Sequence, residues 1–499
     1  MNAPHPLPAP GPGRPTPPIA LAGGPATARL GARAVPVPDD LARRLGDICA
    51  VSDAAAELDE VSRDWWPQAM TWALDGQVAA RAALVARPTA PEQVAEVLRA
   101  CHEARVPVTA AAGRSGVCGA SVPLHGGVVL DLCGLAGVVD VDETSLVLDV
   151  RPGTFGDHLE HQLRTEHGLT LGHWPQSVAL STVGGWLACR SAGQLSTRYG
   201  KIEDMVLGLD MALADGRTLT TGGAPRAAVG PDLTQLFVGS EGTLGIITGA
   251  RLRLHPAPAH EARAAYAFPT FTDGLDAMRR LRQRGATPAV LRLYDATEAD
   301  RSYGTGDRAL LLVLDEGDER LVEATMAIVA DVCASAEAAD VAHVGRWLEH
   351  RNDVAALEAL ISRGYVVDTM EVAGRWRDLP AIYEQTVAAL LAVPGIVAAS
   401  AHQSHTYQDG GCLYFTFAGK VEAEDRDRCY EAAWTAGTTA SLAAGASLSH
   451  HHGVGLNRAR FVADALGGGL DVLRAVKAAL DPHGILNPGK LGLPSPFDA

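Results

Sequence analysis

The sequence contains no run of 18 uninterrupted apolar residues, so it offers no candidate for a membrane-spanning helix. Its 8 cysteines include no C-x-x-C pair, which argues against a zinc ribbon or disulfide scaffold and fits a reducing, cytoplasmic location. Basic residues are outnumbered, 42 against 58 acidic ones, and the net charge of −16 disfavours nucleic-acid binding because an acidic surface repels phosphates. The 499 residues, 47% of them hydrophobic, can bury a large core in two or three domains.

Proline dominates the start of the chain. Residues 1–38 hold 11 of the 30 prolines and 3 arginines but no acidic residue, a composition that cannot pack a core. We therefore expect residues 1–45 to be a disordered tail and residues 46–77 to be an N-terminal helical segment. An organelle transit peptide is the alternative, but the prolines would break the amphipathic helix that such peptides need.

A glycine-rich turn follows the first α/β units. Residues 83–86 and 106–110 read as short strands around a helix, and residues 111–119 (AAGRSGVCG) leave backbone N–H groups uncovered, as in a pyrophosphate-binding nest. A plain strand connection would have the same composition. Because G-x-G-x-x-G is absent and strands at 127–132, 138–141 and 146–150 follow instead of a helix, a Rossmann domain is disfavoured.

Two further glycine clusters occur downstream. Residues 181–186 (STVGGW) are followed by Gly193 and Gly200, and residues 239–248 (GSEGTLGIIT) form the other cluster. Three such segments with serine or threonine hydroxyls indicate one elongated ligand that crosses a single domain. An extended dinucleotide such as FAD meets that demand.

The order of these segments, with 173–177 (HWPQS), 199–204 (YGKIED) and the ending 480–490 (LDPHGILNPGK), resembles the FAD-binding domain of the vanillyl-alcohol oxidase and p-cresol methylhydroxylase superfamily. The resemblance implies an α+β fold. It consists of a two-subdomain FAD-binding domain of the p-cresol methylhydroxylase type over 78–257, an α+β cap domain with an antiparallel sheet over 258–460, and a segment at 461–499 that returns to the FAD domain.

Within the superfamily, 181–186 with Arg190, 199–206, 291–293 (LRL), 412–415 (CLYF) and 447–455 (SLSHHHGVG) resemble the alkyldihydroxyacetonephosphate synthases. The resemblance implies exchange of the acyl chain of acyl-dihydroxyacetone phosphate for a fatty alcohol on FAD, without net electron transfer. It implies a small-molecule or lipid substrate that carries phosphate, and it is compatible with a homodimer and with transient contact with a membrane surface. The alternative is an FAD-dependent oxidoreductase acting on a 2-hydroxy acid or other alcohol.

The family's functional residues map onto this sequence one by one. Its catalytic tyrosine and histidine cluster fall on Tyr414, His450, His451 and His452, and its substrate-binding arginines fall on Arg363, for the phosphate, and Arg292. Its flavin contacts fall on Thr109, Ala110, Ala111, Ala112, Gly113, Arg114, Ser115, Gln176, Ser177, Val178, Ala179, Leu180, Ser181, Thr182, Cys189, Arg190, Ser191, Ala192, Glu241, Gly242, Thr243, Leu244, Gly245, Ile246 and Ile247.

The sequence departs from the family at two places. The first turn reads Ala-Ala-Gly-Arg instead of successive glycines, and a lysine that the family places after the histidine cluster is Leu456 here. If that lysine holds the substrate's phosphate in the family, the acceptor here differs. The first turn also has no histidine for covalent attachment, so we expect noncovalent FAD, although Cys118 and Cys189 are nearby thiols.

Residue chemistry leaves alternatives open at the catalytic positions. In the alternating segment 412–417, Leu413, Phe415 and Phe417 point to the core and Tyr414 points to the opposite face. A phenol with a pKa of about 10 needs a partner that lowers its pKa before it can act as a base, and without one it is a sheet tyrosine with a satisfied hydroxyl. If residues 450–452 are extended, His450 and His452 share a face and His451 faces away, so the three would not readily chelate one metal ion. We therefore expect these histidines to serve acid–base chemistry and substrate hydrogen bonding; a surface loop is the third alternative.

The residue Arg363 precedes an expected strand at 366–372, and Arg292 lies within another expected strand at 289–293. A guanidinium suits bidentate phosphate binding. A lone arginine is also often a solvated surface charge.

Overall fold

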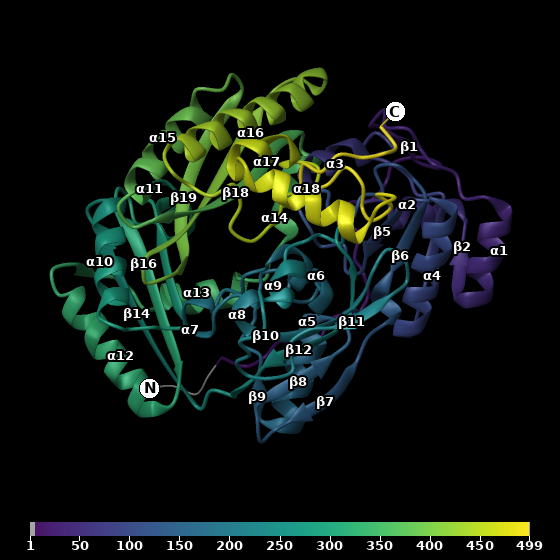
Figure 1. Cartoon of the computed structure of the whole chain (residues 1–499). Helices are drawn as coiled ribbons and strands as arrows, with labels where there is room; N and C mark the ends of the chain where they lie inside the picture. The colour runs from purple at the N-terminus through teal and green to yellow at the C-terminus, as the bar shows by residue number, and fades with distance from the viewer. Residues whose placement is uncertain (1–4, 499) are drawn as a thin grey trace.

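The computed structural model describes residues 5–498 and divides into two regions (Figure 1). The first, which we call the two-sheet region, contains a four-stranded and a five-stranded sheet. The four-stranded sheet has the order β2 (Ala50–Ser52), β4 (Leu84–Arg87), β6 (Val128–Asp131) and β5 (Val108–Ala111). The five-stranded sheet has the order β11 (Thr218–Thr220), β10 (Val206–Ala212), β12 (Ile246–Arg253), β8 (Val147–Val150) and β7 (Val138–Asp142). The strands expected near 83, 106, 127, 138 and 146 are confirmed.

The second, seven-stranded region contains one antiparallel sheet. Its order is β17 (Glu337–Ala338), β14 (His260–Phe268), β16 (Ala309–Gly317), β15 (Val290–Tyr294), β19 (Ile396–Thr406), β20 (Gly410–Lys420) and β18 (Tyr365–Arg375). Two small sheets complete the strands: β1 (Thr27–Ala28) with β3 (Gln77–Val78), and β9 (Leu169–Thr170) with β13 (His255–Pro256). The expected α+β architecture with an antiparallel sheet in its second part is therefore present.

Helices surround the three main sheets. The two-sheet region carries α1 (Asp39–Ile48), α2 (Ala55–Val61), α3 (Pro67–Ala73), α4 (Pro91–Ala104), α5 (Gly156–Gln162), α6 (Val183–Cys189), α7 (Ser196–Tyr199), α8 (Ile202–Met205), α9 (Leu233–Phe237), α17 (Val462–Leu466) and α18 (Gly469–Leu480). The seven-stranded region carries α10 (Phe271–Gln283), α11 (Ala296–Tyr303), α12 (Glu319–Val332), α13 (Ala342–His350), α14 (Ala355–Ser362), α15 (Leu379–Leu391) and α16 (Arg426–Ala443). In the part of the chain described, no helix combines the length and apolarity needed to cross a membrane.

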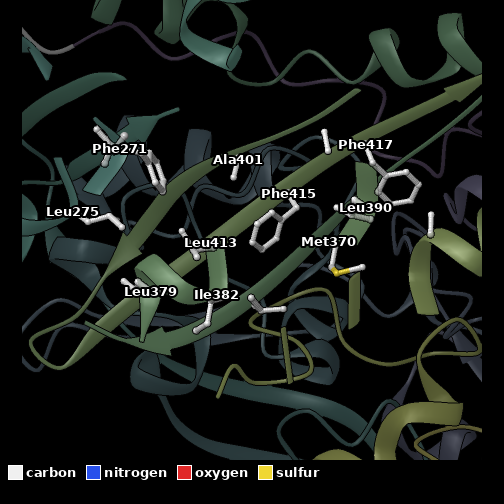
Figure 2. Close-up of a cluster of buried hydrophobic side chains, with 14 of the residues drawn as sticks. Phe271, Leu275, Met370, Leu379, Ile382, Leu390, Ala401, Leu413, Phe415 and Phe417 are labelled. Carbon is white, nitrogen blue, oxygen red and sulfur yellow. The ribbon is translucent and has the colours of Figure 1, made fainter. Parts of the chain in front are cut away.

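The two faces of the seven-stranded sheet differ in what covers them. Helices α10, α12, α15 and α16 pack on the outer face, where Leu413, Phe415 and Phe417 join a fully buried apolar cluster (Figure 2). The alternation expected for residues 412–417 is confirmed, because successive side chains of a strand point to opposite faces. Tyr414 consequently lies on the inner face, which α7, α11, α13 and α14 contact.

The C-terminal segment packs on the two-sheet region. Val108 of β5 donates to the carbonyl of Ile485 at 2.8 Å and accepts from the N–H of Asn487 at 2.8 Å. Asn487 Nδ2 also donates to the carbonyl of Glu241 at 2.7 Å, and Lys490 Nζ donates to the carbonyl of Val122 at 2.7 Å. The C-terminal segment therefore continues the four-stranded sheet beyond β5.

The structure describes the proline-rich segment from residue 5 onward and shows contacts between it and the folded body, and α1 begins directly after it at Asp39. Residues 1–4 of the expected tail lie outside the described part. Gly11 N donates to Asp157 Oδ2 at 2.6 Å, Ala26 N donates to buried Asp59 at 3.0 Å, and Ile19 is 6% exposed. Proline fixes φ but leaves neighbouring N–H and C=O groups free, and fixed side chains of the two-sheet region bond to them. Composition alone missed these partners.

Candidate active site

A cavity of about 830 Å³ lies between the two regions. The three glycine-rich segments line one side of it, and the inner face of β15, β18, β19 and β20 lines the other, together with α14. The segments predicted from sequence to hold one elongated ligand thus meet around a single space.

The first glycine-rich turn follows β5 and touches the second segment directly. A Cβ atom added to Gly113 would lie 2.3 Å from the carbonyl oxygen of Leu180, so no larger residue fits at this contact. Arg114, next in the turn, has φ of +52°, the left-handed conformation that turns successive N–H groups toward one point. This geometry suits the pyrophosphate of a dinucleotide.

Most of the predicted flavin contacts line the cavity: Ala110, Ala111, Ala112, Gly113, Arg114, Ser115, Gln176, Ser177, Leu180, Ser181, Thr182, Cys189, Ser191, Ala192, Glu241, Gly242, Gly245, Ile246 and Ile247. Six predicted contacts lie outside the lining, namely Thr109, Val178, Ala179, Arg190, Thr243 and Leu244. The Glu241 carboxylate is already occupied, because it accepts from the N–H groups of Val454 at 2.5 Å and Gly455 at 2.9 Å.

The lining also offers polar atoms without hydrogen-bond partners in the protein, although one of them, Arg114 Nη1, lies 3.7 Å from Asp131 Oδ2 in an ion pair. Arg114 Nη1, Gln194 Oε1 and Ser404 Oγ are buried and have no hydrogen-bond partner among the described residues. Unpaired buried polar groups are costly unless a ligand or water satisfies them. Together with the glycine turns, these atoms fit the residues of the cavity to FAD.

Tyr414 projects from β20 into the cavity. Its hydroxyl donates to Thr369 Oγ1 at 3.1 Å and lies 3.4 Å from His452 Nε2. Burial raises the pKa of Tyr414 above its ordinary value, so the lowered pKa that a base would need is not provided here. The phenol therefore stays protonated and is suited to donate a proton or hydrogen bond.

Glu371 on β18 holds the histidine loop in place. One carboxylate oxygen accepts from the backbone N–H groups of His450 at 3.2 Å, His451 at 3.1 Å and His452 at 2.8 Å. The other bonds Arg458, whose side chain, like that of Glu371, has no exposed surface. Burial opposes the charge, but Arg458 and His452 keep the pKa of Glu371 well below its usual range. Sequence reasoning missed this pair, since neither residue stands in a motif.

The histidines divide between two environments. His451 and His452 line the cavity, whereas His450 lies behind them, with Nε2 2.7 Å from the hydroxyl of Tyr407. His405 of β19 joins them: one ring nitrogen each of His405, His450 and His451 lies within 4.8 Å of the others, a spacing that a metal ion could bridge. This fourth histidine lies far from residues 450–452 in sequence, so their spacing alone could not reveal it. Burial lowers the pKa of His405, His450 and His451 well below the usual value, so their rings are neutral.

We nevertheless expect elemental analysis of the purified protein to find no stoichiometric transition metal. His450 Nδ1 and His451 Nδ1 lie 2.8 Å apart, a distance at which one ring donates directly to the other. One equivalent of zinc or another transition metal per chain, removed by His405→Ala, would contradict this expectation.

The two predicted substrate arginines are separated. Arg292 lines the cavity, with Nε donating to the hydroxyl of Tyr294 at 2.7 Å. Arg363 ends α14 on the surface, outside the lining, where its carbonyl accepts from Lys420 Nζ at 3.2 Å. The phosphate-binding role expected for Arg363 therefore lacks the required placement. Its neighbourhood in sequence did not reveal which way the helix end faces.

Leu456, the other departure from the family, is absent from the cavity lining. Its N–H donates to the carbonyl of Cys118 at 2.8 Å, and its side chain packs against the apolar cluster of the seven-stranded region. Leu456 therefore does not form part of the cavity wall.

Comparison with known proteins gives consistent matches. A family model described as FAD binding domain matches residues 82–222, and one described as FAD linked oxidases, C-terminal domain, matches residues 257–491. The alkyldihydroxyacetonephosphate synthase of Dictyostelium discoideum is 31% identical, over 83% of this chain and 74% of its own. An uncharacterized FAD-linked oxidoreductase of Escherichia coli O157:H7, YgcU, is 30% identical, over 82% of this chain and 88% of its own.

A solved structure of an alkyldihydroxyacetonephosphate synthase superimposes on the chain with a TM-score of 0.77. It is 26% identical, and the match covers 96% of this chain and 91% of the other. The likeness extends over both regions and hence over both sides of the cavity.

Proposed function

Because the chain belongs to the family of FAD-linked oxidases, we propose that this FAD-dependent enzyme acts as an alkylglycerone-phosphate synthase. In that reaction the acyl chain of acyl-dihydroxyacetone phosphate is exchanged for a fatty alcohol. Bound FAD supplies the electron-accepting ring system for the chemistry. The protein's part is to bind, orient and protonate.

One observation carries the proposal: the cavity is polar at one place and apolar at another. Tyr414, His451 and His452 form its polar wall. Apolar side chains of α14 and the sheet, Leu357, Leu360, Val367 and Ala418, also line it. A substrate with a polar head and an aliphatic chain matches both surfaces.

Each wall has a separate task. Tyr414, kept protonated by burial, donates a proton or hydrogen bond to an oxygen of the polar head, and His452 Nε2 is the nearest ring nitrogen to its hydroxyl. The apolar side chains exclude water from the chain of the substrate. Arg292 supplies positive charge for an anionic group.

The rival function is net oxidation of a 2-hydroxy acid or other alcohol, and the oxidoreductase name of the Escherichia coli relative favours it. Anaerobic photometry separates the two. Exchange of acyl for alkyl chain without loss of the oxidised flavin spectrum supports the synthase, whereas bleaching by a 2-hydroxy acid supports the oxidoreductase.

We further expect the purified protein to be yellow and to release intact FAD when it is denatured. The first glycine turn has no histidine, and burial raises the pKa of Cys189, the thiol that lines the cavity, so that it is a weak nucleophile. Acid precipitation followed by spectroscopy of the supernatant tests this. Flavin that remains on the precipitated polypeptide would show covalent attachment.

A further inference from the structure

Arg292 is held on two of its three nitrogens. Nε donates to the hydroxyl of Tyr294 at 2.7 Å, and Nη2 lies 2.8 Å from His402 Nε2. Nη1 has no hydrogen-bond partner among residues 5–498, and the side chain lines the cavity. The guanidinium is therefore fixed in orientation with donor capacity left over.

The hydrogen-bond partners of His402 determine its tautomer. Its Nδ1 lies 3.1 Å and 3.3 Å from the two carboxylate oxygens of Glu298, which only accept, so Nδ1 carries the proton. Nε2 then has a lone pair and accepts from Arg292. Burial and the charge of Arg292 lower the pKa of His402, which keeps the ring neutral and this arrangement intact.

The same histidine touches the proposed proton donor. The His402 ring stacks on the Tyr414 ring with 4.9 Å between centroids and 15° between planes. Both Glu298 and His402 line the cavity, as does Arg301, the next arginine along the chain from Arg292. No motif singled out Glu298 or His402.

We propose that Glu298 and His402 are positioning residues, which orient Arg292 so that its free N–H groups bind an oxyanion of the substrate. Arg301 adds positive charge to the same lining. A planar guanidinium held on one edge offers its other edge to a phosphate or carboxylate. The identity of the anion rests on the proposed function: the synthase requires phosphate and the rival oxidoreductase requires carboxylate.

The test measures anion binding to the FAD-loaded protein, with inorganic phosphate and oxalate as probes and calorimetry as the readout. His402→Phe keeps a flat ring against Tyr414 but removes the acceptor for Arg292. We expect it to weaken binding of the favoured probe about 10-fold, the effect of losing one hydrogen bond to a charged group. Because the amide oxygen of Gln can accept from Arg292, His402→Gln should restore part of the affinity.

The matched control is His167→Phe. His167 also pairs with a glutamate, Glu143, at 2.8 Å, but it lies outside the cavity lining. This control should bind both probes like the parent. With acyl-dihydroxyacetone phosphate as substrate, His402→Phe should raise KM more than it lowers kcat. A general loss of structure would not produce this pattern.

Unchanged affinity of His402→Phe for both probes, with full FAD content, would overturn the inference. If that variant does not fold, Glu298→Gln replaces it: we expect weaker binding because the charged acceptor that fixes the tautomer is gone, and parental affinity would again overturn the inference. Probe binding needs no turnover, so the two proposals can fail separately. If the parent protein shows no synthase activity but His402→Phe still binds the favoured probe more weakly than the parent, the positioning role is supported and the proposed reaction is refuted. Tighter binding of phosphate than of oxalate supports a phosphorylated substrate, and the reverse order supports a carboxylate.

Discussion

Tyr414→Phe is expected to lower turnover by about 10²-fold or more while FAD content stays at the parental level. The change deletes one oxygen and keeps the ring that stacks on His402. A positioned proton donor typically contributes an effect of this size, and the hydroxyl of Tyr414 lies between Thr369 and His452, which line the cavity with it. Single-turnover kinetics with matched flavin occupancy measure the loss.

Tyr365→Phe is the control for that experiment. Tyr365 begins β18 in the same sheet but lies outside the cavity lining, where Lys420 sits over its ring at 4.3 Å. The control should turn over at the parental rate. Parental turnover of Tyr414→Phe would remove this tyrosine from the mechanism.

Two histidines of the loop, His451 and His452, are expected to contribute to turnover together with Tyr414. His451→Ala and His452→Ala should each lower turnover as well. Combined with Tyr414→Phe, either change should cost less than the sum of the single effects if the groups act as one unit. Full additivity would show that the histidines and Tyr414 act in separate steps.

Removing the Glu371 carboxylate should have the largest effect on stability. Glu371→Ala leaves Arg458 as an uncompensated charge without exposed surface, and it frees the three N–H groups of the histidine loop. Breaking one partner of a buried pair costs about 3–5 kcal/mol. We expect a lower free energy of unfolding in urea, and a fall in turnover because the histidines lose their support.

Two further variants separate the causes. Glu371→Leu combined with Arg458→Met should regain the part of the stability that Glu371→Ala loses through the uncompensated Arg458 charge, because apolar pairs often replace a buried ion pair without loss. The part that comes from the three N–H groups of the histidine loop should stay lost, since leucine offers them no acceptor. Glu57→Ala breaks the exposed pair of Glu57 with Arg87, which is 2.6 Å long, and should change little. If Glu371→Ala unfolds at the parental urea concentration, the buried pair does not contribute as argued.

The contribution of Glu371 to stability depends on pH because its pKa changes on folding. The pKa of Glu371 is lower in the folded than in the unfolded chain, where it is about 4.3. Its stabilisation is therefore complete above that value and is lost as the pH falls toward the folded pKa. Acid unfolding of the parent should accordingly be steeper below about pH 4 than that of the double variant that combines Glu371→Leu with Arg458→Met.

Local patterns predicted the parts of the fold that depend on near neighbours in sequence. The alternation of residues 412–417 placed Tyr414 opposite Leu413 and Phe415, and the structure confirms it. The glycine segments were found because a close backbone approach, such as that of Gly113 to Leu180, tolerates no side chain. These signals are local, so one sequence suffices to read them.

The rest of the site depends on contacts between distant residues. His402 meets Tyr414 because β19 lies beside β20, and His405 of β19 meets His450 and His451. Glu371 meets Arg458 across 87 positions of chain. No spacing in the sequence encodes such a meeting. Arg363 illustrates the opposite case. It precedes β18, as the sequence indicates, but its side chain lies on the surface and not at the cavity.

The pairing of the C-terminal segment with β5 has a consequence for the order in which the protein is made. β5 is the last strand of its sheet in the order β2-β4-β6-β5, and its free edge is covered by Ile485 and Asn487. On the ribosome, Val108 emerges long before Ile485 and Asn487. Until these partners emerge, this strand presents an unpaired edge, the kind of surface on which nascent chains aggregate and which chaperones shield.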